Sequence, residues 1–302
     1  MELSIITAIH NGLEINQLFL EYLKKHTKTK HELIIINNSS TDGSKELFVA
    51  FGAKVIDTNE NLCYRCAQNL GIANSQGDYL CFLNNDVIVG QDWDTITIDI
   101  MKQNNIQVAS PAGIDERGLN APPIANMKYW FDFKKEFKGS AKELFLAYYD
   151  NNFDYFCKNL INHDKEKLRE GINGPAVFIS RKAIEMIKGW NIYVSEPDWH
   201  LGLYLKKREL EKRDITRPYI VTSSWIHHFS QYTINNGKRM PFTCEHKNYD
   251  VRFVWSFSEE MKYWKTGHFI PIHEWPQRFF KRRHYLKSLT QKERLLFKEF
   301  KG

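Results

Sequence analysis

Short apolar runs alternate with amphipathic segments along the first third of the chain. Between the first two runs, Leu13, Leu18, Phe19, Tyr22 and Leu23 recur at helical spacing. The runs themselves are rich in β-branched residues, which is typical of buried strands, and they cover residues 3–9, 33–36, 54–57 and 79–83. Strands and helices that alternate in this way predict an α/β fold, with a doubly wound, mostly parallel sheet and helices on both faces.

A polar triplet, Asn84-Asn85-Asp86, interrupts the most apolar of these segments. It directly follows the run Tyr79–Leu83, and apolar sequence returns at Val87–Val89. In open α/β sheets ligands bind at the carboxyl ends of the strands, and polar groups buried there are costly unless a ligand uses them. One carboxylate beside two amides offers oxygen ligands suited to Mg²⁺ or Mn²⁺. Because Asn and Asp are also ordinary turn residues, a plain strand-to-turn corner is the alternative.

The overall composition is that of a globular protein. Of the 302 residues, 42% are hydrophobic and 26% are charged. The net charge of +6 allows an anionic ligand without requiring a nucleic acid. No apolar run approaches the roughly 18 residues of a membrane span. The sequence therefore predicts a soluble protein, for which peripheral contact with a membrane remains open.

Cysteine usage indicates the compartment. The chain has five cysteines, an odd number, and its N-terminus carries no secretory signal. This predicts reduced thiols and a cytoplasmic protein, in the host cytoplasm if the source is a virus. Cys63 and Cys66 have the spacing of zinc ligands, but no second cysteine pair or histidine pair follows at zinc-finger distance. The sequence therefore argues against a zinc site.

Two common nucleotide-binding motifs are missing from the sequence. The chain contains neither the Gly-x-Gly-x-x-Gly fingerprint of dinucleotide-binding folds nor the Gly-x-x-x-x-Gly-Lys loop of P-loop proteins. These absences disfavour hydride transfer and ATP hydrolysis. A nucleotide would have to bind in another manner.

Three segments in the first third of the chain carry a resemblance to a known family. Ile34–Ser44 is similar to a family segment that reads IIVVDNGSTDGS. Asn61-Leu62 followed by Asn69–Ile72 is similar to a family segment N-L-G…N-x-G-I. Gly77–Val87 is similar to a family strand that reads G-x-Y-L-x-F-L-D-D-D-V. Together, in this order, they resemble family-2 glycosyltransferases with the GT-A fold, similar to rhamnosyl- and glucosyltransferase-like members.

The resemblance implies a donor, a cofactor and a set of site residues. The donor would be a nucleoside-diphosphate sugar, with UDP favoured, and the cofactor a divalent ion, Mn²⁺ or Mg²⁺. Asp86 would hold the metal together with His228, which is preferred over His227; a buried structural histidine is the alternative. The residues expected at the nucleotide sugar are Thr7, Ile9, Asn11, Asn37, Asn38, Asp42, Asn69, Asn84 and Asn85.

The chain departs from the family pattern at its carboxylates. Asn37 stands where the family has a carboxylate at the end of the second strand, and Asn84 and Asn85 replace the first two aspartates of the metal motif. Fewer carboxylates weaken the binding of a divalent ion. A non-catalytic GT-A-like binding protein is therefore one alternative to an enzyme.

The resemblance returns at residues 173–181 and again near a predicted helix start. Ser195–Leu201 corresponds to the family's E-D-x-D-L segment, and Asp198 takes the position of the catalytic base. Because Pro197 replaces the preceding acidic residue, Glu196 is the fallback base. A simple capped helix, with Pro and Asp in its first turn, is the structural alternative.

We expect a GT-A domain over residues 1–230 and a basic extension over 231–302. The domain divides into a nucleotide-sugar-binding half (1–110), an aromatic helical insertion on the acceptor side (111–172) and an acceptor and catalytic-base half (173–230). The rings of the insertion either stack on a sugar or base, or pack against one another. Gly237-Lys238-Arg239 is a candidate loop over the phosphates. The basic tail from Trp275 suits a membrane surface, a nucleic acid or a helix that closes on the core.

The predicted reaction is metal-dependent, inverting transfer of a sugar to an acceptor hydroxyl. A surface or lipid-linked glycan is the first expectation for the acceptor. A hydroxylated base of phage DNA, flipped out of the helix, is the alternative. A non-catalytic binding protein is the third reading, from a different functional class.

Overall fold

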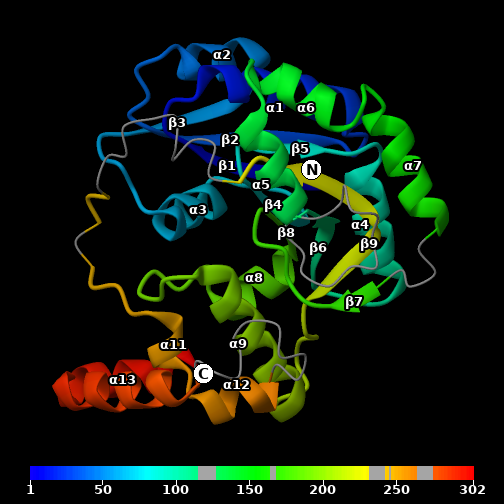
Figure 1. Cartoon of the computed structure of the whole chain (residues 1–302). Helices are drawn as coiled ribbons and strands as arrows, with labels where there is room; N and C mark the ends of the chain where they lie inside the picture. Colours follow the sequence, from blue (N-terminus) through cyan, green and yellow to red (C-terminus); the bar gives the residue numbers. More distant parts are fainter. Residues whose placement is uncertain (115–126, 164–167, 231–241, 245, 264–274) are drawn as a thin grey trace.

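The computed structural model describes residues 1–114, 127–163, 168–230, 242–244, 246–263 and 275–302. These residues form one nine-stranded sheet in the order β3-β2-β1-β4-β8-β6-β9-β5, with β7 paired to β9 beside this path (Figure 1). The strands are β1 (Leu3–Ile9), β2 (His31–Asn38), β3 (Lys54–Thr58), β4 (Tyr79–Leu83), β5 (Val87–Val89), β6 (Val108–Gly113), β7 (Leu168–Glu170), β8 (Ala176–Ser180) and β9 (Tyr219–His228).

The N-terminal half of the sheet is parallel, as the sequence predicts. β1 lies between β2 and β4, and β3 forms the edge beyond β2. One face packs against α1, α2 and α4, and the other against α3, α8 and α9. Because both faces are buried, β2 and β4 contain the continuous apolar runs Leu33–Ile36 and Tyr79–Leu83 instead of alternating residues, whereas the edge strand β3 is partly exposed. The helices are α1 (Leu13–His26), α2 (Ser44–Phe51), α3 (Tyr64–Ala73), α4 (Trp93–Gln103), α8 (Arg181–Ile187) and α9 (Pro197–Glu211).

The second half of the sheet mixes parallel and antiparallel pairs. β8 runs antiparallel to β4 and β6, while β9 runs parallel to β6 and antiparallel to β5. The sequence predicts a strand over Tyr219–Ser223, but β9 continues to His228. It continues because its last residues pair with β5, with His228 opposite Val87. His228 therefore lies at the end of a strand and not in the loop after it.

The insertion forms three helices, α5 (Met127–Glu136), α6 (Ala141–Tyr148) and α7 (Phe153–His163). Its rings join α1 and β9 in one aromatic cluster, whose buried members include Tyr22, Trp130, Phe145, Tyr148, Tyr149, Phe153 and Phe229. Among the described residues of the insertion, Tyr129 and Tyr155 are the exposed rings, at 47% and 66%. The rings mainly build a core, which is the second of the two interpretations of this segment.

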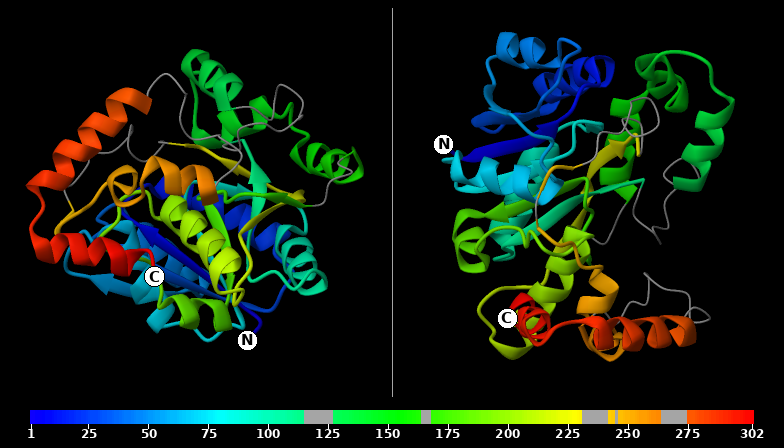
Figure 2. Two further views of the ribbon diagram at one scale, coloured as in Figure 1. Left: turned by 90° about the horizontal axis from the view of Figure 1, so that it is seen from below. Right: turned by 90° about the vertical axis from the view of Figure 1, so that its left-hand side faces the viewer.

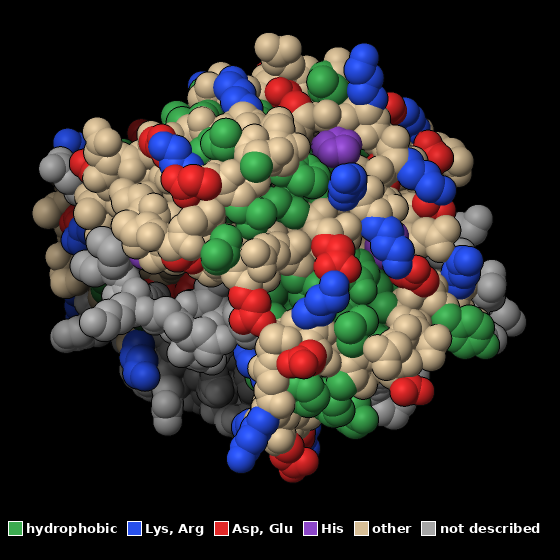
Figure 3. All heavy atoms as spheres, turned by 90° about the horizontal axis from the view of Figure 1, so that it is seen from above, with side chains coloured by type: hydrophobic (Ala, Val, Ile, Leu, Met, Phe, Trp, Pro, Cys, Tyr) green, Lys and Arg blue, Asp and Glu red, His purple; other side chains and the backbone are tan. Residues whose placement is uncertain are grey.

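The surface over the upper elements of the fold carries charges of both signs. Figure 3 shows Lys and Arg side chains interspersed with Asp and Glu on the face seen from above. Two ion pairs tie α1 to the insertion, between Lys142 and Glu21 at 2.7 Å and between Lys25 and Asp154 at 2.8 Å. Exposed pairs of this kind contribute little to stability, about 0–1 kcal/mol each. This face therefore offers no large field of a single sign.

The C-terminal residues pack against α9, at the end of the molecule away from α2 (Figures 1 and 2). They form α11 (Val251–Val254), α12 (Phe257–Tyr263), α13 (Trp275–Ser288) and α14 (Gln291–Phe300). Phe297 and Phe300 of α14 are buried with Leu203 of α9 and Trp255. Within the described part of the chain, no helix combines the length and the apolarity needed to cross a bilayer. The loop Gly237-Lys238-Arg239 and the side chains of residues 275–280 lie outside the described residues.

His200 in this interface makes stability depend on pH. The histidine is buried on α9, and its Nδ1 accepts a hydrogen bond from Trp255 Nε1 at 3.0 Å. Burial lowers the pKa of His200 to about 3. The unfolded chain binds a proton below about pH 6.5, whereas the folded chain does not until about pH 3. We therefore expect this group to lower the free energy of unfolding by about 1.4 kcal/mol for each pH unit below 6.5.

Urea unfolding between pH 7 and pH 4.5 measures this effect. Gln at position 200 keeps an acceptor for Trp255 but does not titrate, so the free energy of unfolding of His200→Gln should fall less steeply with decreasing pH than that of the wild type. Parallel curves for the two proteins would show that His200 is protonated in the folded state.

Candidate active site

The polar triplet forms the turn between β4 and β5. Asn84 is held in place by its backbone N–H, which donates to the carbonyl of Pro175 at 2.9 Å. Asn85 is buried, and its Nδ2 donates to Asn16 Oδ1 at 2.8 Å. Asp86 is only 5% exposed. The turn thus places one buried carboxylate and two amides at the carboxyl end of β4.

Asp86 lies beside His228, with 3.1 Å between Asp86 Oδ1 and His228 Nε2. Burial alone would raise the pKa of Asp86. The charge of His228, its hydrogen bond and the charge of Lys134 outweigh burial, so the pKa of Asp86 lies below its ordinary value. The carboxylate is therefore ionised at neutral pH. A buried anion next to an imidazole is a suitable pair of metal ligands.

The neighbouring His227 has a different environment. Its ring lies within the aromatic cluster, 4.4 Å from the Trp130 ring centroid and 5.1 Å from that of Phe229. Its Nδ1 is 2.9 Å from Tyr149 Oη. Burial lowers the pKa of His227 well below its ordinary value, and the charge of His228 lowers it further. His227 is a neutral core residue, whereas His228 faces Asp86.

The end of β2 and the loop after it are fixed by side-chain hydrogen bonds. Asn37 Nδ2 donates to Asp57 Oδ1 at 2.8 Å, and Asn38 Nδ2 donates to the Leu62 carbonyl at 3.1 Å. Asn11 Oδ1 accepts from the Thr41 N–H at 2.7 Å. These bonds join the ends of β1, β2 and β3 with the segment that leads into α3.

Asp42 holds the start of α1 to the same loop. Its Oδ2 accepts from the Leu13 N–H at 2.8 Å and its Oδ1 from the Ser44 N–H at 3.1 Å. Burial raises the pKa of Asp42, but its hydrogen bonds, first that with Ser44, lower it by more. The carboxylate thus stays charged at the N-terminal ends of α1 and α2, where a helix favours an anion.

Three other residues are expected at the nucleotide sugar, and the structure places them inside the fold. Thr7 and Ile9 are buried in β1. Asn69 on α3 donates to the Trp190 carbonyl at 2.9 Å and accepts from the Trp190 N–H at 2.8 Å. This pair of bonds ties α3 to the turn after α8, so the Asn69 amide acts in packing in this structure.

Asp198 lies in the first turn of α9, packed against a glycine. A Cβ at Gly174 would lie 2.4 Å from Asp198 Oδ2, so the close approach requires a residue without a side chain. The next residue, Pro175, is the one that accepts from Asn84. The turn at 174–175 thus lies between Asp198 and the polar triplet.

Glu196 occupies the N-cap position of α9 with a positive φ of 20°. Its Oε2 accepts from the Val251 N–H at 3.3 Å and from the Ser195 hydroxyl. These contacts hold the C-terminal residues to the start of α9. Of the two predicted base candidates, Asp198 lies by the turn at 174–175, and Glu196 is hydrogen-bonded to the C-terminal segment.

Sequence reasoning missed two residues close to this site. Lys134 of α5 donates to the carbonyls of Phe229 and Ser230, each at 3.4 Å, and its charge acts on Asp86. Tyr64 of α3 lies near Asp198: burial raises the pKa of this tyrosine, and the charge of Asp198 raises it further. Neither residue belongs to a recognisable motif. Lys134 is one of three lysines in α5, and nothing in the sequence distinguishes it from Lys128 and Lys135.

Comparisons with known proteins agree with this architecture. Residues 4–168 match the model of glycosyl transferase family 2. Glycosyltransferase AglE of Haloferax volcanii is 28% identical over 124 residues, which cover 39% of this chain and 38% of that protein. An uncharacterized glycosyltransferase of Haemophilus influenzae is 31% identical over 110 residues, 34% of this chain and 44% of that one. The chain thus matches less than half the length of either relative.

One solved structure shows the likeness of fold. The crystal structure of GalNAc-T7 with UDP, GalNAc and Mn²⁺ aligns with a TM-score of 0.52 and 13% identity, over 76% of this chain and 44% of that one. The predicted α/β architecture of GT-A type is confirmed by this likeness together with the family match. Because the family model matches more than half of its residues, the chain belongs to glycosyltransferase family 2.

Proposed function

We infer that this chain is a metal-dependent, inverting glycosyltransferase that moves a sugar from a nucleoside-diphosphate sugar to an acceptor hydroxyl. The observation that carries the inference is the pairing of buried Asp86 with His228 at the carboxyl end of β4, in a chain of family 2. Ligands of open α/β sheets bind at this edge. Asp198 lies across the turn at 174–175 from the same triplet.

The donor atoms around Asp86 suit Mn²⁺ or Mg²⁺. Asp86 supplies a carboxylate, His228 an imidazole, and Asn84 and Asn85 supply amide oxygens. Asn85 uses its amide nitrogen on Asn16, so its carbonyl oxygen is the atom left for a ligand. The metal, when bound, neutralises charge on the leaving diphosphate. Since GalNAc-T7 was solved with UDP and Mn²⁺, a UDP-sugar with Mn²⁺ is the first donor to test.

Other residues of the chain would deprotonate the acceptor, stabilise the leaving phosphates and bind the nucleotide. Asp198 accepts the proton of the acceptor hydroxyl as that oxygen attacks the anomeric carbon. Lys134, whose charge acts on the Asp86 site, places a cation near the leaving phosphates. The end of β2, with Asn37 and Asn38, and the loop after it, with Asp42, form the wall that we assign to the nucleotide.

We place the acceptor among surface or lipid-linked glycans. The alternative, a base of phage DNA, drew on the aromatic insertion as a stacking surface. Apart from Tyr129 and Tyr155, the described rings of this segment are buried or half-buried in the aromatic cluster. The face in Figure 3 mixes both signs of charge, so this face lacks the predominantly basic surface of a DNA-binding site.

A screen of nucleotide sugars tests the proposal. Thermal unfolding of the wild type is followed with each donor, with and without Mn²⁺, and the release of nucleoside diphosphate is measured. One donor should stabilise the protein only with metal, and slow hydrolysis should release its diphosphate. The anomeric configuration of the product, read by NMR, tests inversion. If no donor binds under any condition, the non-catalytic alternative replaces the enzyme.

Asp86→Ala should remove the metal-dependent part of donor binding. We expect the affinity for the donor with Mn²⁺ to fall at least about tenfold, or 1.4 kcal/mol, because the one carboxylate of the triplet is lost. Asp99→Ala, at an exposed carboxylate on α4, is the matched control and should bind like the wild type. Titration calorimetry at fixed Mn²⁺ gives both affinities. Equal affinities for Asp86→Ala and the wild type would exclude Asp86 as a metal ligand.

A further inference from the structure

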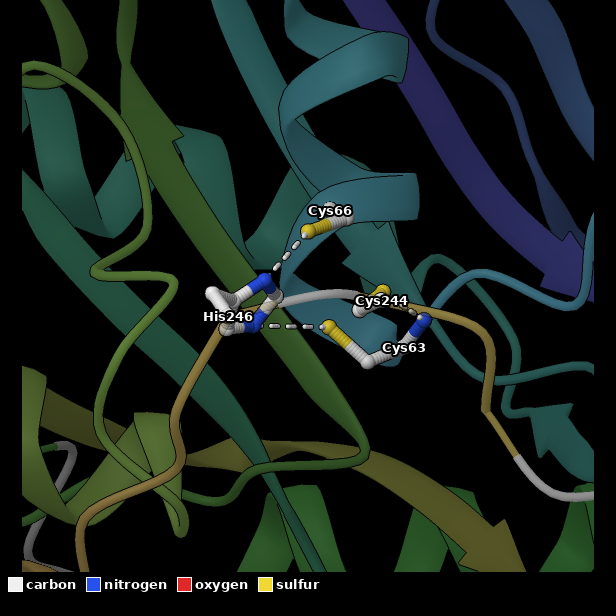
Figure 4. Close-up of side chains that lie close together, drawn as sticks. All are labelled: Cys63, Cys66, Cys244 and His246. Atoms are coloured by element: carbon white, nitrogen blue, oxygen red, sulfur yellow. Dashed lines mark hydrogen bonds between the residues drawn. The ribbon is translucent and has the colours of Figure 1, made fainter.

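Two segments far apart in the sequence bring four soft ligands together. Cys63 is the N-cap residue of α3 and Cys66 lies in its first turn. Cys244 and His246 come from the segment that precedes α11, and Cys63 and Cys244 are 181 positions apart. The three sulfurs and a ring nitrogen all lie within 4.8 Å of one another. Figure 4 shows the side chains converging from α3 and from the C-terminal segment.

The distances fit a tetrahedral metal site. Zn–S bonds of 2.3 Å and Zn–N bonds of 2.0–2.1 Å separate the ligand atoms by roughly 3.5–3.8 Å. His246 can offer only one ring nitrogen to an ion, and either one faces a thiol: Nε2 lies 3.7 Å from Cys63 Sγ, and Nδ1 lies 4.0 Å from Cys66 Sγ. The backbone N–H of Cys63 donates to Cys244 Sγ at 3.0 Å. Shortening the distances between the ligand atoms by at most about 1.3 Å would bring all four to zinc geometry.

The chemistry of the ligands separates this cluster from the Asp86 site. Three thiols and an imidazole are the donor set of structural zinc sites, and they contain no carboxylate that would favour Mg²⁺ or Mn²⁺. A disulfide would use two of the cysteines but would give no role to the third thiol and the histidine. We propose that Cys63, Cys66, Cys244 and His246 form a structural zinc site.

The surroundings show what such a site would hold together. The Thr243 N–H donates to the Asn61 carbonyl at 3.1 Å, and the Arg65 guanidinium donates to Asn248 Oδ1. Farther along, the Ser195 N–H donates to the Tyr249 carbonyl at 2.8 Å, just before α9. The metal would fasten the C-terminal segment to the loop before α3. That loop adjoins the wall assigned to the nucleotide, because the Leu62 carbonyl accepts from Asn38.

Tyr64, between the two cysteines of α3, packs against Trp190, with 5.9 Å between the ring centroids. A metal at the start of α3 would therefore also hold Tyr64 against Trp190. The zinc proposal rests on the four ligands alone and does not depend on the proposed transfer reaction.

Metal analysis of the purified protein tests the site directly. Protein made with Zn²⁺ in the medium should carry about one zinc ion per chain by mass spectrometry of the elements. Cys244→Ser and His246→Ala should each lose most of it. Cys157→Ala removes a buried thiol of the aromatic cluster and should keep its zinc. Asp86→Ala should keep it too, because Asp86 contributes no ligand to this set.

Cobalt substitution keeps the test decisive if a variant fails to fold. Wild-type protein stripped of zinc and loaded with Co²⁺ should show the absorption bands of tetrahedral Co²⁺ and of thiolate-to-metal charge transfer. Added Zn²⁺ should abolish these bands. A wild-type protein with no zinc and no thiolate–Co²⁺ band would overturn the proposal, as would a disulfide between Cys63 and Cys66 in protein purified under reducing conditions.

Discussion

Replacing Asp198 with Asn is expected to slow sugar transfer by about 10²- to 10⁴-fold, the usual contribution of a general base. Asn keeps the size and polarity of the side chain, so the contact with Gly174 is preserved while the basic oxygen is lost. Donor binding should change little, because Asp198 acts on the acceptor. Rates of nucleoside-diphosphate release, measured at saturating donor and Mn²⁺, give the loss in kcat.

Glu196→Gln is the matched control, since Glu196 is the other candidate base. Its carboxylate accepts from the Val251 N–H and the Ser195 hydroxyl, so the substitution should affect mainly the contact of α9 with the C-terminal segment. We expect turnover within a few-fold of the wild type. A large loss in Glu196→Gln together with an active Asp198→Asn would assign the base to Glu196.

The parts of the fold that depend on local pattern could be predicted from the sequence. The apolar runs predict the parallel strands, because a strand buried on both faces is a continuous run of apolar residues. The helical spacing of apolar residues predicts α1. The polar triplet was located for the same reason, since Asn84-Asn85-Asp86 breaks that signature at a strand end. Family resemblance then supplied Asp198 and His228, which no periodicity would have singled out.

The parts that depend on distant pairing could not be predicted. β9 is longer than expected because its end pairs with β5, where His228 lies opposite Val87, a residue 141 positions earlier in the chain. Lys134 reaches the Asp86 site from the insertion, where nothing local marks its direction. Cys244 and His246 could not be paired with Cys63 and Cys66 from the sequence, because about 180 positions separate the two pairs and only the fold brings them together.

We expect the aromatic rings of the insertion to stabilise the core and not to bind the acceptor. Substitution of Trp130 is the strongest test of this expectation. The Trp130 side chain is fully buried; its Nε1 donates to the Phe229 carbonyl at 3.3 Å, and its ring centroid lies 4.9 Å from that of Tyr148. Trp130→Ala should lower the free energy of unfolding by about 3–5 kcal/mol, through lost burial and the cavity left behind. Urea unfolding at pH 7 measures the change.

Tyr129→Ala is the control on the same helix. Its side chain is 47% exposed, so the loss in stability should stay below about 1 kcal/mol. Trp130 also supports α5, which carries Lys134 to the carbonyls of Phe229 and Ser230. Trp130→Ala should therefore weaken donor binding as well, even at temperatures where the protein stays folded. If Trp130→Ala were as stable as Tyr129→Ala but lost acceptor binding alone, the ring would belong to an acceptor surface and the packing interpretation would be wrong.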